Sequence, residues 1–443
     1  MLDISLIREA PDKVAAALAK KEVSVDFTEL LAWDRERREL IRAGEQLKAR
    51  RNQVSADIPR LKKEGADVDA LIAEMKETGD RIRESDAVLA KLEADIAGFL
   101  EVLPNMPADD VQAGGKENNE VVRVFGEKPE FSFKIKDHVE LVTSLGLIDY
   151  ERGVKLGGSG FWLYKGDGAL LEWALLNFFI EEHIKDGYEF ILPPHILTYA
   201  SGYAAGQFPK FEEDVFAIAG PGAVGRSAAE AGERGVEGTG ERAFSQFMLP
   251  TAETALVNIH RDEILSEDEL PKKYFSFTPC YRSEAGGART EERGMIRGHQ
   301  FNKVEMFQYT LPECSDGAFA ELTEKAERLM RKLGLHHRVS KLAAADCSAA
   351  MAKTFDIEVW LPSMGIYKEV SSVSNAMDYQ ARRGNMRFRR KESRRNEYLH
   401  TLNASGLATS RIFPAILEQL QREDGSVVVP EALRKWVGKE ILT

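Results

Sequence analysis

The stretch that decides the fold runs from Phe277 to Tyr309 and reads FTPCYRSEAGGARTEERGMIRGHQFNKVEMFQY. An apolar run, a polar loop and a second apolar run predict a hairpin of two strands. Side chains alternate along a strand, so we expect Arg282 and Glu284 on one face of the sheet. Arginines at both ends of the loop, with Phe301 on the returning strand, are suited to a nucleotide and its phosphates. The alternative is an exposed hairpin with a salt-bridged surface.

The same stretch resembles motif 2 of the class II aminoacyl-tRNA synthetases, in the form of the bacterial-type seryl-tRNA synthetases (FRSEAG, a loop, then IRxHQFxKVE). The resemblance implies an α+β fold, with an antiparallel sheet flanked by helices and an N-terminal antiparallel α-helical coiled-coil arm. It implies a serine–tRNA ligase that forms AMP and pyrophosphate. Such an enzyme activates L-serine with ATP to seryl-adenylate and transfers the seryl group to serine tRNA, and also to selenocysteine tRNA.

Composition limits the class of protein. The chain has 443 residues, of which 43% are hydrophobic and 30% charged, which is typical of a globular protein of two or three domains. The net charge of −12 argues against indiscriminate nucleic-acid binding, so any RNA contact requires a local basic patch. The cysteines, Cys280, Cys314 and Cys347, have no CxxC spacing, so we expect no zinc and a reducing, cytoplasmic location. We also expect neither a signal peptide nor a membrane partner.

Apolar residues recur every seven positions in the N-terminal part of the chain. The first series is Trp33, Leu40, Leu47, Val54 and Leu61, and the second is Val68, Met75, Ile82, Leu89, Ile96 and Leu103. Two heptad stretches separated by KKEGAD predict an antiparallel helical hairpin with a coiled-coil seam. We expect Pro59 to kink or end the first helix near the tip of the hairpin.

Charge indicates what this arm contacts. From Asp34 to Lys63 there are ten Lys or Arg and five Asp or Glu, and Arg37 and Arg51 interrupt the second seam. Such a surface fits structured RNA, read by charge and shape; the alternative is an ordinary solvated coiled-coil face. By resemblance, residues 30–100 hold the long variable arm of serine tRNA.

The chain divides into three predicted parts. These are an N-terminal helical domain with the tRNA-binding arm (1–103), a linker rich in Pro, Gly and acids (104–130) and a class II catalytic domain (131–443). A Gly- and Ala-rich piece at about 217–246 is interpreted as an insertion loop, because its composition cannot bury a core. A helix at 168–184 and a strand at 190–192 resemble motif 1, which implies a homodimer.

The predicted site residues come from four clusters and rest on the resemblance. The ATP-binding residues are Arg282, Glu284, Arg297, Phe301, Glu369, Ser372 and Arg411. The serine-binding residues are Thr251, Glu253, Arg282, Glu305, Asn403 and Ser405. Arg282 and Arg411 are the predicted catalytic residues, because they spread charge on the phosphates. Glu369 and Ser372 are the predicted ligands of Mg²⁺, which prefers oxygen and takes few ligands from protein. The loop 285–293 is expected to reach the acceptor end of the tRNA.

Two runs depart from the family's pattern. Ala404 and Ser410 stand where motif 3 has glycine, and Ala343 to Cys347 replaces a CTGD-like run but keeps Asp346. Two alternatives stay open at this point: a paralogue that serves resistance or secondary metabolism, and a non-catalytic RNA-binding homologue. The second is disfavoured because the charged residues of the motifs are all present.

Overall fold

The computed structural model describes residues 1–65, 67–219, 244–284 and 294–443. Its contacts divide the chain into two compact units. The helical unit comprises Leu2–Ala19 and Val23–Leu103, and the sheet unit comprises Met1, Lys20–Glu22 and Pro104–Thr443. No helix among these described residues is long and apolar enough to cross a membrane.

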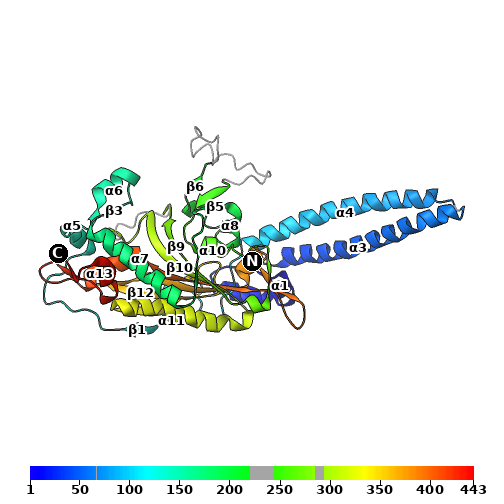
Figure 1. Cartoon of the computed structure of the whole chain (residues 1–443). Coiled ribbons are helices and arrows are strands. Elements are labelled where there is room, and N and C mark those ends of the chain that lie inside the picture. The colour runs from blue at the N-terminus through cyan, green and yellow to red at the C-terminus, as the bar shows by residue number, and fades with distance from the viewer. Residues whose placement is uncertain (66, 220–243, 285–293) are drawn as a thin grey trace. The chain divides into compact units, whose positions relative to one another are not determined.

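The helical unit consists of four helices. They are α1 (Ile4–Glu9), α2 (Pro11–Ala19), α3 (Thr28–Lys63) and α4 (Asp69–Glu101). Helices α3 and α4 lie side by side, as Figure 1 shows. Trp33 packs on Phe99 near one end, and Arg50 pairs with Glu74 nearer the other, so the two helices are antiparallel. The predicted coiled-coil arm is therefore confirmed.

The heptad pattern agrees with the burial of the arm, with one qualification at Pro59. Val54, Ile82 and Ile96 are buried along the seam. Helix α3 runs through Pro59 and ends at Lys63, so the proline does not itself end the helix, and a kink at this position stays a prediction. The hydrogen bond that proline removes falls near the helix end, where the exposed backbone can bond to water instead.

The sheet unit is built on an eight-stranded sheet of order β1-β11-β12-β13-β16-β10-β9-β4. Its strands are β1 (Glu120–Phe125), β4 (Glu189–Phe190), β9 (Lys272–Tyr281), β10 (Gln300–Thr310), β11 (His337–Lys341), β12 (Lys353–Leu361), β13 (Ile366–Met377) and β16 (His400–Ala408). Neighbouring strands are antiparallel, except that β4 pairs parallel with β9. The predicted α+β architecture, an antiparallel sheet flanked by helices, is confirmed.

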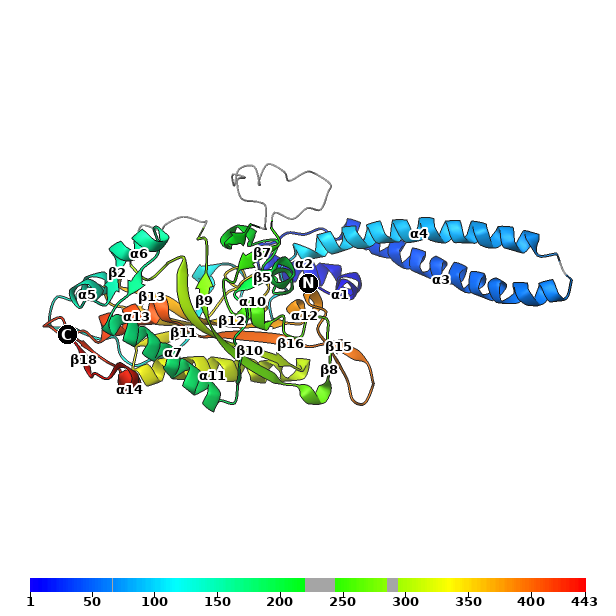
Figure 2. The same cartoon turned by 45° about the horizontal axis from the view of Figure 1, so that its top comes forward.

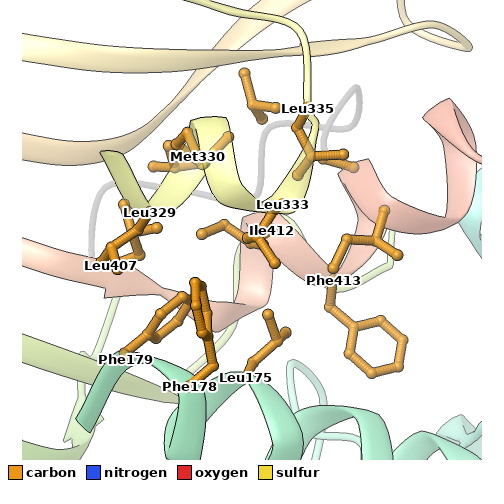
Figure 3. Packing of buried hydrophobic residues seen from close by; sticks show 14 of the residues in the cluster. Leu175, Phe178, Phe179, Leu329, Met330, Leu333, Leu335, Leu407, Ile412 and Phe413 are labelled. Carbon is orange, nitrogen blue, oxygen red and sulfur yellow. The ribbon is translucent and has the colours of Figure 1, made fainter. Parts of the chain in front are cut away.

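Three helices cover one face of this sheet: α7 (Asp167–Lys185), α11 (Ser315–Leu333) and α13 (Thr409–Gln419) (Figure 2). Figure 3 shows their side chains packed together, with Phe179 of α7, Met330 of α11 and Ile412 of α13 in one cluster. Alternate residues of the central strands, such as Met306 and Leu402, enter this core. The residues between them therefore point to the opposite face.

Smaller elements complete the sheet unit. The helices are α5 (His138–Ser144), α6 (Tyr150–Gly157), α8 (Tyr199–Ala204), α10 (Glu253–Leu256), α12 (Tyr379–Arg383) and α14 (Arg434–Val437). The strands are β2 (Ile148–Asp149), β3 (Leu163–Tyr164), β5 (Ile196–Thr198), β6 (Ala217–Ile218), β7 (Gln246–Met248), β8 (Ile264–Ser266), β14 (Arg387–Arg389), β15 (Asn396–Tyr398), β17 (Val427–Val428) and β18 (Ile441–Leu442).

Two predicted segments differ in detail from the structure. The segment 104–130, predicted as a linker, contains β1, which pairs with β11 at the edge of the main sheet. The strand predicted at 190–192 is β4, which ends at Phe190; Leu192 is 72% exposed. Most of the predicted insertion, 220–243, lies outside the described residues, and its flanking strands β6 and β7 pair with each other.

Candidate active site

A cavity of about 470 Å³ lies on the sheet face opposite the three helices. All the predicted site residues line it. They are Thr251, Glu253, Arg282, Glu284, Arg297, Phe301, Glu305, Glu369, Ser372, Asn403, Ser405 and Arg411. Strand alternation explains the gathering, because Glu305 on β10 and Ser405 on β16 point away from the core that their neighbours enter. The roles of these residues stay predictions.

The hairpin of β9 and β10 carries the first group. Arg282 follows β9 directly, and its guanidinium lies 5.2 Å from the ring centroid of Phe301. The Arg282 Nε also donates a hydrogen bond to the Pro250 carbonyl at 3.4 Å. This bond holds the guanidinium in place while the side chain still lines the cavity.

Glu284 lines the cavity because of the backbone conformation after β9, and not because side chains alternate along a strand. β9 ends at Tyr281, and Glu284 has a φ of 52°, in the left-handed region. The argument that placed Arg282 and Glu284 on one strand face is therefore wrong, because Glu284 is not in a strand. Its carboxylate instead forms an ion pair with Arg297 across the hairpin. The loop 285–293, predicted to reach tRNA, lies outside the described residues.

A bulge shapes the part of the site formed by β16. The register between β10 and β16 shifts between Lys303 and Glu305, and Leu407 in this region has a φ of 95°. A bulge bends a strand and redirects the residues that follow it. The next helix, α13, begins at Thr409 and brings Arg411 to the cavity. The Arg411 Nη1 donates a hydrogen bond to the Glu369 carbonyl at 2.7 Å.

The other end of the cavity is a buried pocket with a compensated charge. The Lys303 Nζ donates to the Thr251 Oγ1 at 2.6 Å and lies 2.6 Å from the Glu305 Oε2. Glu253 accepts a hydrogen bond from the Gln380 Nε2 at 2.8 Å. Burial, followed by the negative charge of Glu305, raises the pKa of Glu253 to about 7. When both carboxyl groups are ionised, one ammonium group balances only one of the two negative charges, so the pocket can attract a second cation.

The sequence analysis missed Lys303, which is 7% exposed and central to this pocket. The signal was present, because Lys303 lies two residues before Glu305 in a strand and so shares its face. Gln380 was also missed. It comes from α12, and no local pattern links it to Glu253.

An oxygen-rich corner of the cavity fits a hard cation. Glu369 and Ser372 on β13 both line the cavity, and Asp356 on β12 is opposite Ser372 in register. Burial, with the nearby Glu369 charge, raises the pKa of Asp356 well above its usual range, and its Oδ1 has no hydrogen-bond partner among the described residues. The described residues hold no group of three or more His, Cys, Asp or Glu arranged for a metal ion. A metal here would need ligands from the substrate, which is the habit of Mg²⁺.

The departures from the family's pattern fall in different places. Ala404 enters the helix-covered core, on the face away from the cavity, whereas Ser410 lines the cavity. The Asp346 Oδ2 accepts a hydrogen bond from the Asn119 Nδ2 at 2.7 Å, so this residue ties its run to the segment just before β1. Ser410 is therefore the substitution in motif 3 that a bound ligand would meet.

Part of the basic charge between residues 382 and 395 is paired with carboxylates within the protein. Arg390 forms ion pairs with Glu267, Glu313 and Glu397. Arg382 pairs with Asp378 at 2.8 Å. These pairs favour a structural role over a phosphate-binding one.

Comparisons with known proteins show which family the chain resembles. Residues 1–107 match the model of the seryl-tRNA synthetase N-terminal domain, and residues 240–420 match the tRNA synthetase class II core domain (G, H, P, S and T). The chain is 62% identical to serine–tRNA ligase 2 of Clostridium acetobutylicum and 45% identical to serine–tRNA ligase of Thermodesulfovibrio yellowstonii, with all of each chain covered.

A solved structure is similar over the same length. The crystal structure of seryl-tRNA synthetase from Pyrococcus horikoshii complexed with ATP aligns with a TM-score of 0.88 and 32% identity, covering 100% of this chain and 99% of that one. The sequence relatives and this solved structure point to the same family over the whole length of the chain. The chain belongs to the seryl-tRNA synthetase family, the serine–tRNA ligases among the class II synthetases.

Proposed function

We propose that this chain binds ATP and L-serine in the cavity, joins them as seryl-adenylate with release of pyrophosphate, and passes the seryl group to serine tRNA. One observation carries the proposal. The arginines and Phe301 of one end, and the carboxylate–lysine pocket of the other, open into the same cavity. Two reactants held in adjoining sites react as if in one molecule, which removes much of the entropic cost of meeting.

The ATP end rests on Arg282, Phe301 and Arg411. Phe301 offers a ring face for adenine, and Arg282 lies near enough to that ring to reach the α-phosphate of the same nucleotide. Arg411, tied to the Glu369 carbonyl, would hold the β- or γ-phosphate. A serine carboxylate oxygen then attacks the α-phosphorus, and the bond to the pyrophosphate oxygen breaks. The arginines stabilise the charge that develops on the phosphates, and no covalent enzyme intermediate is required.

Magnesium is part of this proposal. Glu369 and Ser372 would hold it, and it would neutralise phosphate charge and fix the shape of the bound ATP. The residues fit, because they offer only oxygen atoms and Asp356 adds a buried carboxylate beside them.

The serine end would select by charge and by hydrogen bonds. Glu253 would bind the ammonium group of serine, and Glu305 and Thr251 would bind the hydroxyl group of its side chain. Asn403 and Ser405 complete the lining of this end of the cavity. A site built to bond a hydroxyl group rejects analogues without it, because its buried polar groups would then lose their partners. Alanine should therefore be a poor substrate.

The remaining parts of the proposal concern partners. The exposed basic side chains of α3, such as Arg42 and Lys62, support contact with the long variable arm of serine tRNA. The exposed apolar residues of α7 and the turn after it support a homodimer. The domain boundaries of the sequence analysis and a cytoplasmic location belong to the same proposal.

The test is serine-dependent exchange of pyrophosphate into ATP, run beside charging of serine tRNA with and without its long variable arm. We expect exchange with serine and charging that needs the variable arm. Arg282→Ala should reduce exchange by more than about a hundredfold, because one transition-state donor is worth that much. The absence of serine-dependent exchange by the wild type would contradict the proposal.

A further inference from the structure

One wall of the cavity is a short segment, Ser348–Ala352, which we call the wall segment. Its residues Ser348, Ala350 and Met351 line the cavity. Ala350 lies close to Gly206, where an added Cβ would be 2.9 Å from the Ala350 Cβ. Gly206 also has a φ of 77°, so this close approach requires glycine.

The wall segment adjoins the proposed serine end of the cavity. The Ala205 carbonyl, next to Gly206, accepts a hydrogen bond from the Gln380 Nε2 at 3.0 Å. The same amide group bonds Glu253. A shift of the wall segment would therefore press on Gly206 and reach Glu253 through Gln380.

Two side chains hold the wall segment by its carbonyl groups. The Lys21 Nζ donates to the Met351 carbonyl at 2.7 Å and to the Ser348 carbonyl at 3.1 Å. The Asn105 Nδ2 donates to the Ala350 carbonyl at 3.0 Å. Asn105 also uses its backbone N–H, which bonds the Ala349 carbonyl at 2.7 Å.

Burial makes both anchors strong. Lys21 is 7% exposed and Asn105 is 5% exposed. Burial lowers the pKa of Lys21 to about 8, and no carboxylate forms an ion pair with it among the described residues. The ammonium group thus depends on the wall carbonyls, and a buried charge that loses its partners is strongly disfavoured.

We propose that Lys21 and Asn105 are positioning residues that set the serine end of the cavity through the wall segment. The inference rests on the proposed function of that end and adds residues outside the family motifs. Along the chain, Lys21 lies between α2 and α3, and Asn105 follows α4. Both residues belong to the sheet unit, although they are more than eighty residues apart along the chain.

The test compares Lys21→Met with Lys20→Met in the full-length chain. Lys20 is the matched control, because its Nζ bonds the Asp109 and Val111 carbonyls and not the wall segment. Serine KM and ATP KM are measured by pyrophosphate exchange, and melting temperature by calorimetry. We expect Lys21→Met to raise serine KM about tenfold, with ATP KM within about twofold, and Lys20→Met to change neither.

Two more variants distinguish a specific effect on the serine end from a general loss of stability. Asn105→Ala should raise serine KM in the same selective way, and Lys21→Arg, which keeps a cationic donor, should recover most of the loss. Equal rises in serine and ATP KM, or an unchanged serine KM in both Lys21→Met and Asn105→Ala, would overturn the inference. A wild type without serine-dependent exchange would instead overturn the proposed function and the inference together.

Discussion

Glu253 should make serine binding depend on pH. Burial and the charge of Glu305 raise the pKa of Glu253 to about 7, and only its ionised form attracts the serine ammonium. Serine KM should therefore fall as pH rises from about 6 to about 8, with an inflection near the pKa. Glu253→Gln should raise KM and remove the dependence, while ATP KM stays level. Initial rates of pyrophosphate exchange across this range test it; a flat serine KM for the wild type would contradict it.

Lys303 should be essential to the charge balance of the pocket. Lys303→Met leaves Glu305, 2% exposed, without its cation, and a buried charge stripped of its partner costs about 3–5 kcal/mol. We expect a lower melting temperature and a serine KM raised by roughly a hundredfold. Adding Glu305→Gln should restore much of the melting temperature but not the KM. If the single variant melts like the wild type, the pair does not carry this role.

At the scale of elements, Glu172 joins three of them. It lies on α7, is 4% exposed, and accepts hydrogen bonds from Asn302 on β10 at 2.7 Å and Thr409 of α13 at 2.6 Å. Burial raises its pKa from 4.5 to about 7. The folded state therefore holds this proton more tightly than the unfolded state, so the stability it supplies is present below pH 4.5 and is lost as pH rises through about 7.

Glu172→Gln should reveal that loss. The amide cannot ionise, so the melting temperature of the variant relative to wild type should rise between about pH 5 and pH 8, by the equivalent of about 2–3 kcal/mol. Glu181→Gln is the matched control on the same helix. The pKa of Glu181 is lowered to about 2, so its relative melting temperature should stay constant over that range. A constant difference for Glu172→Gln as well would contradict the assignment.

The arm of α3 and α4 should act on tRNA and not on the adenylate step. The buried Asp34 binds Arg8, Arg37 and Arg38, which removes part of the positive charge from the exposed surface. Arg42 and Lys62 are exposed on α3.

Reversing the charge of these two residues tests the arm. Arg42→Glu with Lys62→Glu should lower tRNA charging by about tenfold or more. The slope of the logarithm of the tRNA binding constant against the logarithm of salt concentration should become shallower by the equivalent of about two phosphate contacts. Pyrophosphate exchange should not change. Lys91→Glu, on α4 outside the basic stretch, is the control and should have a smaller effect. Equal losses in tRNA charging and pyrophosphate exchange would contradict the prediction that the arm acts on tRNA alone.

At the scale of the whole molecule, the exposed apolar residues point to self-association. Trp173 is 59% exposed and Leu192 is 72% exposed, and both lie in the segments that resemble motif 1. Large exposed apolar patches mark interfaces. Trp173→Glu with Leu192→Glu should convert a dimer to a monomer in light scattering after size exclusion. Val88→Glu, at an exposed position on α4, should leave the mass unchanged. A monomeric wild type would contradict the proposal.

Local patterns in the sequence were enough for much of this protein. Heptads predict α3 and α4 because coiled-coil helices bury every third and fourth residue, and two apolar runs on either side of a polar loop predict β9 and β10. The motif residues at 282, 305 and 411 could be named because each sits in a short run that resembles a motif of the seryl-tRNA synthetases.

Only the tertiary structure brings these runs together. Glu369 and Asn403 are far apart along the chain and meet because β13 and β16 are neighbours in the main sheet, whereas Thr251 follows β7 of a separate three-stranded sheet and reaches the same cavity, where Lys303 bonds it. The roles of Lys21, Gln380 and Glu172 had no local signal, because each depends on contacts with residues distant in sequence. Sequence patterns report which face of an element is buried, whereas the packing of whole elements decides which polar groups share a cavity.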